Sequence, residues 1–443
     1  QKMKISKKSL GKQHSLISVQ LIEKDYSEKV NEILVNYSKT ANMPGFRKGH
    51  IPLGLVKKQY GKAVIVDEVN KIIQEELRKY LVTEKLDILG SPLPVSNDDI
   101  DWTSGELNFD FEIGLTPDFD INLKFKKPVT SYTITADDKM INDQIANIQN
   151  QYGKLISKKE VSKADEITAL FVSEGEEINN KFTFKLDKIK SKSTAKSITG
   201  LKVGDKITIK TNNLFVNQAD LVSALKISTE KAENLKIELE LSIEEINFRE
   251  PADLDVELFD KLFGKGIVKT ATELKKKIAE DAEKQFVQQS DQKLLNDVTE
   301  YLIDNTKFVL PSDFLHKWMQ TAGEKDLTLE EAKAEYEKSE KSMRYQLIEG
   351  KIITENKLQV NMDEVKSYTK EMITNQMLQY GQTNPGDKEL EDIVTRVLSN
   401  QDEVKRISEQ LTSQKILSFF KENVNLKAKK LSYEKFVKEV YGA

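Results

Sequence analysis

The sequence contains no cysteine, and it has no apolar run near the ~20 residues that a membrane-spanning helix needs. Without cysteine the chain can form neither disulfides nor thiolate metal sites, and it has no thiol nucleophile. Its three histidines, His14, His50 and His316, are too scattered for a metal-binding motif. No nucleotide-binding or serine-hydrolase motif occurs in the sequence. We therefore expect no cofactor, no metal and no membrane partner. The absence of cysteine is also compatible with a cytoplasmic location.

Proline and glycine are scarce in the second half of the chain. Six of the nine prolines precede residue 129, and only five glycines follow Gly266. Few helix breakers over such a length favour long helices. The 443 residues suggest about three domains. Charged residues make up 32%, against ~25% in typical domains, so we expect much surface for the mass, as in a protein with helical arms.

The front of the chain has a mixed α+β pattern. Residues 14–19 are strand-like, and residues 26–37 carry apolar side chains at helical spacing. A second helix is predicted from the spacing of Val66, Val69, Ile73 and Leu77. A half-buried strand is predicted from the alternation of Leu107, Phe109, Phe111 and Ile113.

The pattern changes twice further along the chain. Alternating strands are predicted around residues 167–171, 182–186, 207–209 and 235–243. From Pro251 onward the pattern is helical. One long helix there has a thin apolar stripe, formed by Leu274, Ile278, Leu294, Val298 and Leu302. So thin a stripe predicts that the helix buries little of itself and either projects or lines an open cavity.

The strongest local signal is an acid-free segment, residues 33–66, between Glu32 and Asp67. In a chain of net charge −4 it carries six cations: Lys39, Arg47, Lys48, Lys57, Lys58 and Lys62. At its centre Phe46, Arg47 and Lys48 lie between glycines, which permit tight turns, with a proline on either side. The pattern predicts a loop that presents an aromatic ring and cations to an anionic partner. The alternative is a solvated basic loop whose Phe46 folds back onto the core.

Residues 43–52, Met-Pro-Gly-Phe-Arg-Lys-Gly-His-Ile-Pro, closely resemble the ribosome-binding signature of the bacterial trigger factor family. The family pattern is Gly-Phe-Arg-x-Gly-Lys-x-Pro, from which this sequence departs at His50. Further similarity at residues 109–117, 254–264 and 309–311 extends over essentially the whole chain. The resemblance implies contact with ribosomal protein and rRNA near the exit tunnel through seven residues: Gly45, Phe46, Arg47, Lys48, Gly49, His50 and Pro52.

The resemblance implies an α+β, multidomain chain. Its order would be an α+β ribosome-binding domain (1–128), a linker (129–152), an FKBP-like β-rich domain (153–249) and an all-α C-terminal domain with helical arms (250–443).

The FKBP-like region departs most from the family. Residues 197–205 resemble the segment that leaves the central FKBP helix, but the upstream part of that helix, with its aromatic pocket floor, is missing or unrecognisable. Phe171, Phe182 and Phe184 alternate as strand core. Prolyl isomerisation has a barrier of ~18–20 kcal/mol, and the family lowers it in an apolar aromatic pocket. We therefore assign no catalytic residue and expect peptidyl-prolyl isomerase activity to be weak or absent.

Five of the eight methionines lie between positions 319 and 377 in the helical region, Met362 among them. Methionine suits surfaces that bind many partners, although ordinary helix core is the alternative. The candidate client-binding residues are Met319, Met343, Met372, Met377, Leu378 and Tyr380.

The resulting hypothesis is an ATP-independent chaperone that docks at the ribosome exit tunnel and shields nascent or unfolded polypeptides. Weak multivalent contacts suit release without fuel, and the high charge keeps an apolar cradle soluble. The alternatives are a peptidyl-prolyl cis–trans isomerase acting on unfolded chains and a ribosome-free holdase of the same fold. The resemblance also allows a homodimer off the ribosome.

Overall fold

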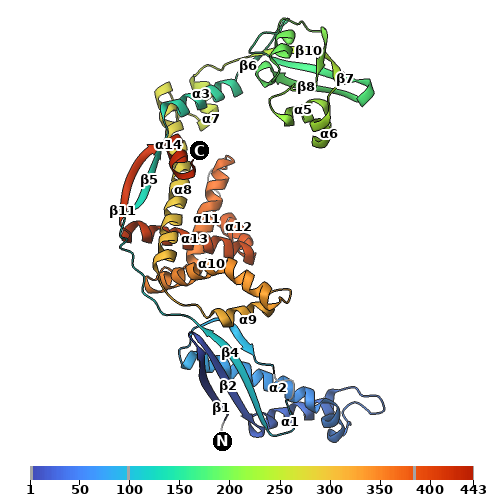
Figure 1. Ribbon diagram of the computed structural model, residues 1–443, viewed down its shortest axis with the longest axis vertical. Helices are drawn as coiled ribbons and strands as arrows, with labels where there is room; N and C mark the ends of the chain where they lie inside the picture. Colours follow the sequence, from blue (N-terminus) through green and yellow to red (C-terminus); the bar gives the residue numbers. More distant parts are fainter. Residues whose placement is uncertain (1–2, 97–99, 383–385, 443) are drawn as a thin grey trace. The chain divides into compact units, whose positions relative to one another are not determined.

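The computed structural model describes residues 3–96, 100–382 and 386–442 (Figure 1). The chain forms two compact units. Unit 1 comprises the residues up to Val129 together with Lys293–Lys427, and unit 2 comprises Thr130–Gln292 together with the residues from Ala428 onward. Each unit is therefore assembled from two separate stretches of sequence.

The N-terminal part of unit 1 is a four-stranded antiparallel sheet, in the order β1-β2-β4-β3, with two helices packed together beside it (Figure 1). Ile17, Val19 and Leu21 of the second strand are buried in one cluster with apolar residues of both helices, such as Leu34 and Ile73. The elements are β1 (Lys4–Gly11), β2 (His14–Ile22), α1 (Glu23–Thr40), α2 (Leu53–Thr83), β3 (Ile88–Pro94) and β4 (Glu106–Leu115).

Residues 116–128, which we call the strap, have no regular secondary structure and lead from β4 toward unit 2. The rest of unit 1 is helical. It contains the C-terminal part of α8 (Ala271–Asn305), followed by α9 (Ser312–Ala322), α10 (Leu329–Glu355), α11 (Met362–Gln379), α12 (Asp387–Leu398) and α13 (Gln401–Asn423).

Helix α9 holds the N-terminal sheet to the helical part of unit 1. The Trp318 indole N–H donates to the Ser91 hydroxyl at 3.1 Å, and the Lys317 ammonium lies 3.0 Å from the Glu112 carboxylate. Gly114 of β4 leaves no room for a side chain, because a Cβ there would lie 2.5 Å from the Phe314 ring. The sheet and the helices therefore share a close contact within the unit.

Unit 2 contains a five-stranded antiparallel sheet in the order β6-β10-β7-β8, with β9 also paired to β10. A separate two-stranded sheet joins β5 and β11. The elements are β5 (Val129–Thr135), α3 (Asp138–Gln151), β6 (Lys154–Ser157), β7 (Glu166–Ser173), η1 (Glu174–Glu176), β8 (Ile178–Lys185), η2 (Leu186–Lys188), α4 (Lys192–Ile198), β9 (Lys206–Lys210), α5 (Gln218–Leu225), α6 (Thr229–Asn234), β10 (Glu238–Glu250), α7 (Val256–Phe263), β11 (Leu426–Ser432) and α14 (Tyr433–Tyr441).

The predicted α+β, multidomain class is confirmed, with β11 as an unpredicted strand in the helical region. The five residues of the apolar stripe on α8 are buried, and most other residues of this helix are half-buried or exposed, so the helix buries little of itself. The helix changes partners along its length: Leu274 and Ile278 join one apolar cluster, and Leu294, Val298 and Leu302 join another. None of the helices in the described part of the chain has the length and apolarity of a membrane span.

Candidate functional site

Residues 43–52, which we call the basic loop, connect α1 to α2. Met43 and Ile51 are buried in the same apolar cluster as both helices, so they fix the two ends of the loop. Residues 44–50 between them are all exposed, and the Phe46 side chain is not folded back onto the core, since 40% of the residue is accessible. Of the two alternatives left open by the sequence, the geometry favours the loop that presents its aromatic ring.

Two successive turns shape the basic loop. The Phe46 N–H donates to the Met43 carbonyl at 3.1 Å, and the His50 N–H donates to the Arg47 carbonyl at 3.0 Å. Gly45 and Gly49 adopt φ values of 88° and 85°, a region that strains residues with a side chain. The loop therefore closes its hydrogen bonds within itself and leaves the side chains of Phe46, Arg47 and Lys48 outward.

The cations of the acid-free segment are exposed and unpaired. Within the described ranges, none of the six makes an ion pair with a carboxylate or a side-chain hydrogen bond: Lys39, Arg47, Lys48, Lys57, Lys58 and Lys62. The segment is thus a cationic surface with no internal counterion. Such a surface attracts a polyanion, and binding releases counterions from it.

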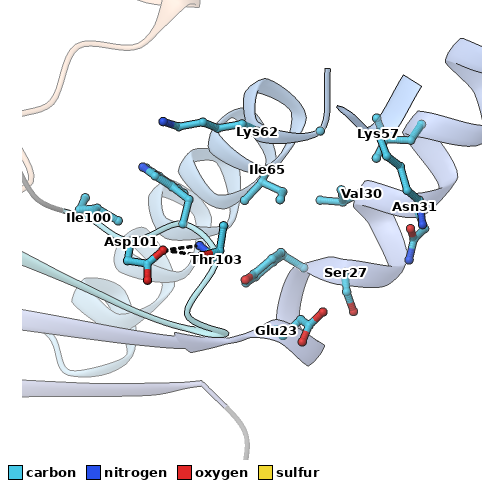
Figure 2. A pocket seen from close by; sticks show the side chains of 14 residues that line it. Glu23, Ser27, Val30, Asn31, Lys57, Lys62, Ile65, Ile100, Asp101 and Thr103 are labelled. Carbon is cyan, nitrogen blue, oxygen red and sulfur yellow. Dashed lines mark hydrogen bonds between the residues drawn. The ribbon is translucent and has the colours of Figure 1, made fainter. Parts of the chain in front are cut away.

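A cavity of 480 Å³ is lined by residues of α1, α2 and the segment 100–103 (Figure 2). Val30 and Ile65 contribute apolar lining, and Lys57 and Lys62 line it as well. On one side the Asp101 carboxylate accepts hydrogen bonds from the Thr103 hydroxyl at 2.6 Å and the Thr103 N–H at 3.0 Å, which lower the pKa of Asp101. The sequence did not predict this cavity. Its lining comes from three separate segments, and Trp102 lies about 40 residues after the last lining residue of α2, so no local pattern joins them.

The six candidate client-binding residues do not form one surface. Met319 and Met343 are half-buried against the cluster of Leu310, Phe314 and Tyr336, where core packing accounts for them. The other four lie on or just after α11.

Of those four, Met377 packs partly against the cluster of α11 and α12, whereas Leu378 is 50% exposed and Tyr380 is 81% exposed. Met372 is half-buried. The exposed apolar residues at the end of α11 are therefore the members of the set best placed to meet another chain.

Four of the five aromatic residues of the β-rich domain pack into its core, whereas Phe248 lines a pocket beside α4. Phe171, Phe184 and Phe215 are buried in one cluster, and Phe182 packs edge-on against Phe215 with ring centroids 5.8 Å apart. The prediction that these rings are strand core is confirmed. They are unavailable as the walls of an open proline pocket.

The residues just upstream of 197–205, where the upstream part of the central helix was missing or unrecognisable in the sequence, form the short helix α4. Its N-terminus is built from hydroxyl groups in place of an aromatic floor. The Ser191 side chain caps the helix by accepting from the Thr194 N–H at 3.3 Å, and it also bonds to the hydroxyls of Thr194 at 3.1 Å and Ser193 at 3.0 Å. These hydroxyls satisfy one another in a polar, solvent-accessible site.

Three family models match the chain. The model described as "Bacterial trigger factor protein (TF)" matches residues 3–148, "Probable trigger factor, FKBP-like domain" matches 155–251, and "Probable trigger factor, C-terminal domain" matches 290–440. The models follow one another in the order that the resemblance implied. Together they span most of the chain.

Curated relatives match over nearly the full length. The trigger factor of Treponema denticola is 21% identical over 465 aligned residues, covering 97% of this chain and 98% of that protein. The trigger factor of Rhizobium johnstonii is 23% identical over 462 residues, covering 96% and 87%. That of Sulfurimonas denitrificans is 30% identical over 181 residues, 39% of this chain and 40% of that protein.

The fold is also similar to a solved structure of the trigger factor chaperone from work on promiscuous substrate recognition in its folding and assembly activities. The TM-score is 0.55 at 14% identity, and the match covers 95% of this chain and 100% of that one.

Proposed function

Because this chain belongs to the bacterial trigger factor family of chaperones, we propose that it docks at the ribosome exit tunnel and shields nascent polypeptides there without ATP. The observation that carries the proposal is the basic loop, which exposes Phe46 between unpaired cations. The functional division follows the sequence: docking by residues 1–128, a linker at 129–152, a divergent FKBP-like domain at 153–249 and client binding by 250–443.

Docking combines two contacts at the tip of the basic loop. Arg47 and Lys48 meet anionic rRNA, and the Phe46 ring inserts into an apolar notch or stacks on a base. Gly45, Gly49 and Pro52 shape the tip, and His50 keeps a polar group where the family usually carries a lysine. The partners are ribosomal protein and rRNA near the exit, so the working location is the cytoplasm. The family resemblance alone also allows a homodimer off the ribosome.

The test is ribosome co-sedimentation of a variant with all three tip residues replaced by alanine. We expect association to be abolished, and we expect wild-type binding to fall steeply between low and moderate salt, because counterion release drives part of it.

A matched control lies in the loop after α7, where two lysines and an exposed isoleucine lie beside glycines of positive φ: Lys265, Ile267 and Lys269. Its triple alanine variant loses the same charge and should bind as the wild type does. Unchanged co-sedimentation of the basic-loop variant would overturn the docking proposal and leave the ribosome-free holdase.

Client binding rests on scattered apolar contacts in the helical region, with Leu378 and Tyr380 most exposed and Met372 and Met377 beside them. Met319 and Met343 contribute less, because both are half-buried in a core cluster. A chain lacking residues 153–249 should therefore still suppress aggregation of a refolding protein. If that activity followed the deleted domain, the helical region would not be the client site.

The isomerase alternative has a separate test. The hydroxyl cluster at α4 and the burial of Phe171, Phe184 and Phe215 argue against a dry aromatic pocket for a twisted imide, and the pocket beside α4 has Phe248 as its one aromatic lining residue, among charged side chains. A tenfold rate gain needs about 1.4 kcal/mol of selective stabilisation. We expect little or no acceleration of cis–trans isomerisation in a short proline peptide by the full chain. Acceleration of the size typical of FKBP-type enzymes would favour the enzyme.

A further inference from the structure

The strap buries every second side chain although it belongs to no sheet. Phe119 and Phe125 are buried, Ile121 and Leu123 are half-buried, and the residues that alternate with them, from Asp120 to Lys124, are exposed. This is the period of an extended strand. The surface beneath is helical, however, and is formed by residues of α8, α10 and α13.

Two aromatic anchors fix the strap. The Phe119 ring stacks on Phe308 with centroids 4.3 Å apart, and the Phe125 ring stacks on Tyr301 at 3.7 Å. The Lys351 ammonium lies 4.9 Å from the centroid of the Phe119 ring. The two anchors are six positions apart in the sequence, and extended chain of that length spans about 20 Å.

Side chains of the helical region satisfy the backbone of the strap. The Asn425 amide accepts from the Phe125 N–H at 2.8 Å and donates to the Phe125 carbonyl at 3.0 Å, as a neighbouring strand would. The Tyr301 hydroxyl accepts from the Lys126 N–H at 3.3 Å.

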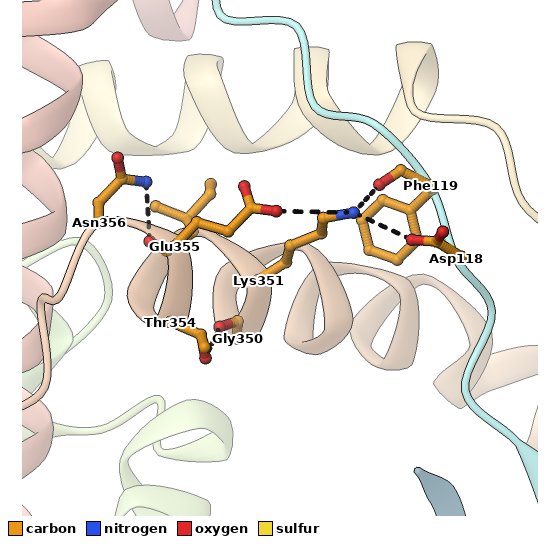
Figure 3. Close-up of polar contacts among 8 residues, drawn as sticks. Asp118, Phe119, Gly350, Lys351, Thr354, Glu355 and Asn356 are labelled. Atoms are coloured by element: carbon orange, nitrogen blue, oxygen red, sulfur yellow. Dashed lines mark hydrogen bonds and ion pairs between the residues drawn. The ribbon is translucent and has the colours of Figure 1, made fainter. Parts of the chain in front are cut away.

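At the other end Lys351 donates to the Phe119 carbonyl and pairs with the Asp118 carboxylate at 3.2 Å, as Figure 3 shows. Such groups recognise peptide backbone and are indifferent to most side chains. Together with apolar sites at alternate positions, they form a receptor for an extended chain of broad sequence.

We propose that the surface of α8, α10 and α13 beneath the strap is a binding groove for extended polypeptides, occupied in cis by the strap. When the strap lifts, the groove takes a client segment with apolar side chains at every second position. This rests on the proposed chaperone function and adds to it a site, a client pattern and a built-in competitor.

Competition depends on tethering. The strap is held beside its groove at an effective concentration in the millimolar range or higher, so a free peptide cannot displace it. A nascent chain that emerges next to a docked chaperone is itself held close, and it competes on similar terms. The strap thereby keeps the groove covered until a tethered client arrives.

The test uses the full chain and a fluorescently labelled peptide with the sequence of residues 116–128. Replacing both anchors in the protein, Phe119→Ala with Phe125→Ala, weakens the strap and leaves the groove intact. We expect the peptide to bind this variant at least tenfold more tightly than the wild type, and to raise the unfolding temperature of the variant only.

The control peptide has the same composition, with each phenylalanine exchanged for the residue that follows it. The anchors then leave the face that carries Ile121 and Leu123, so binding to the variant should fall about tenfold. Equal binding of both peptides, or equal binding of the strap peptide to variant and wild type, would overturn the groove proposal.

Hydrogen exchange of the wild type provides a test that needs no variant. We expect the Phe125 and Lys126 amides to exchange through a local opening, at least tenfold faster than the core amides of α10. Exchange of both sets at one rate would mean that the strap never lifts separately, and would also overturn the proposal. Neither test involves ribosomes or aggregation, so failure here is distinct from failure of the docking or chaperone proposals.

Discussion

The basic loop and the strap both lack regular secondary structure, and both carry phenylalanine beside lysine or arginine, yet one is free and the other is held. The loop satisfies its backbone by two turns within itself, at glycines of positive φ, and residues 44–50 are exposed. The strap contains no glycine, and its backbone is bonded by side chains from up to 300 residues away. The difference shows that the source of backbone hydrogen bonds, more than composition, decides whether an irregular segment presents its side chains or buries them.

The largest expected contrast is in stability. Phe125→Ala removes a ring that is 5% exposed and stacked on Tyr301, and should destabilise unit 1 by about 3–5 kcal/mol. Phe46→Ala removes an exposed ring and should change stability by less than about 0.5 kcal/mol. Both tryptophans, Trp102 and Trp318, lie in unit 1, so denaturant unfolding followed by their fluorescence reports on this unit. Similar shifts for the two variants would break the comparison.

A smaller effect should come from the backbone of the strap. Asn425→Ala leaves the Phe125 N–H and carbonyl without their partner, and should destabilise unit 1 by about 1–3 kcal/mol in the same measurement. Asn423→Ala is the matched control, because that amide donates to the Phe419 carbonyl on its own helix at an exposed position. If the two variants were equally stable, side-chain bonding to the strap would contribute nothing.

The smallest stability effect concerns the basic loop. Gly49→Ala forces a side chain into a left-handed conformation and should cost about 1–2 kcal/mol, which the loop can relieve by changing shape. We therefore expect weaker ribosome association with only a slight shift in unfolding. Gly54→Ala, in the first turn of α2 with nothing within 4 Å of the new Cβ, should leave association intact and stabilise the helix slightly. Equal association of both variants would contradict the role of the glycine turns.

Much of the fold could be predicted from the periodicity of apolar residues and from the positions of glycine and proline. The strands at Leu107 and Phe171, the helix around Val30 and the loop between Pro44 and Pro52 depend on neighbours close in sequence, so their patterns were visible. Helix α4 was unrecognised because its serines and its one threonine are poor helix-interior residues and the helix is short, and the Ser191 cap is visible only in the structure.

The sequence did not show which residues pack together when they lie far apart along the chain. The alternation from Phe119 to Phe125 was present, but alternation predicts a strand in a sheet, and the helical groove lies far along the chain. For the same reason the methionine pattern could not separate the half-buried Met319 and Met343 from the exposed end of α11.

Unit 1 is built from two separate stretches of the chain, which has a consequence for the synthesis of the protein itself. Phe125 bonds to Asn425, and at roughly 5–20 residues per second the ribosome needs about 15–60 s to make the intervening 300 residues. During that interval the surface beneath the strap is incomplete, because Tyr301 and Phe308 are made well before Asn425. On the proposed function, the protein is itself a nascent client while it is being made, and its own synthesis should benefit from finished copies already in the cell.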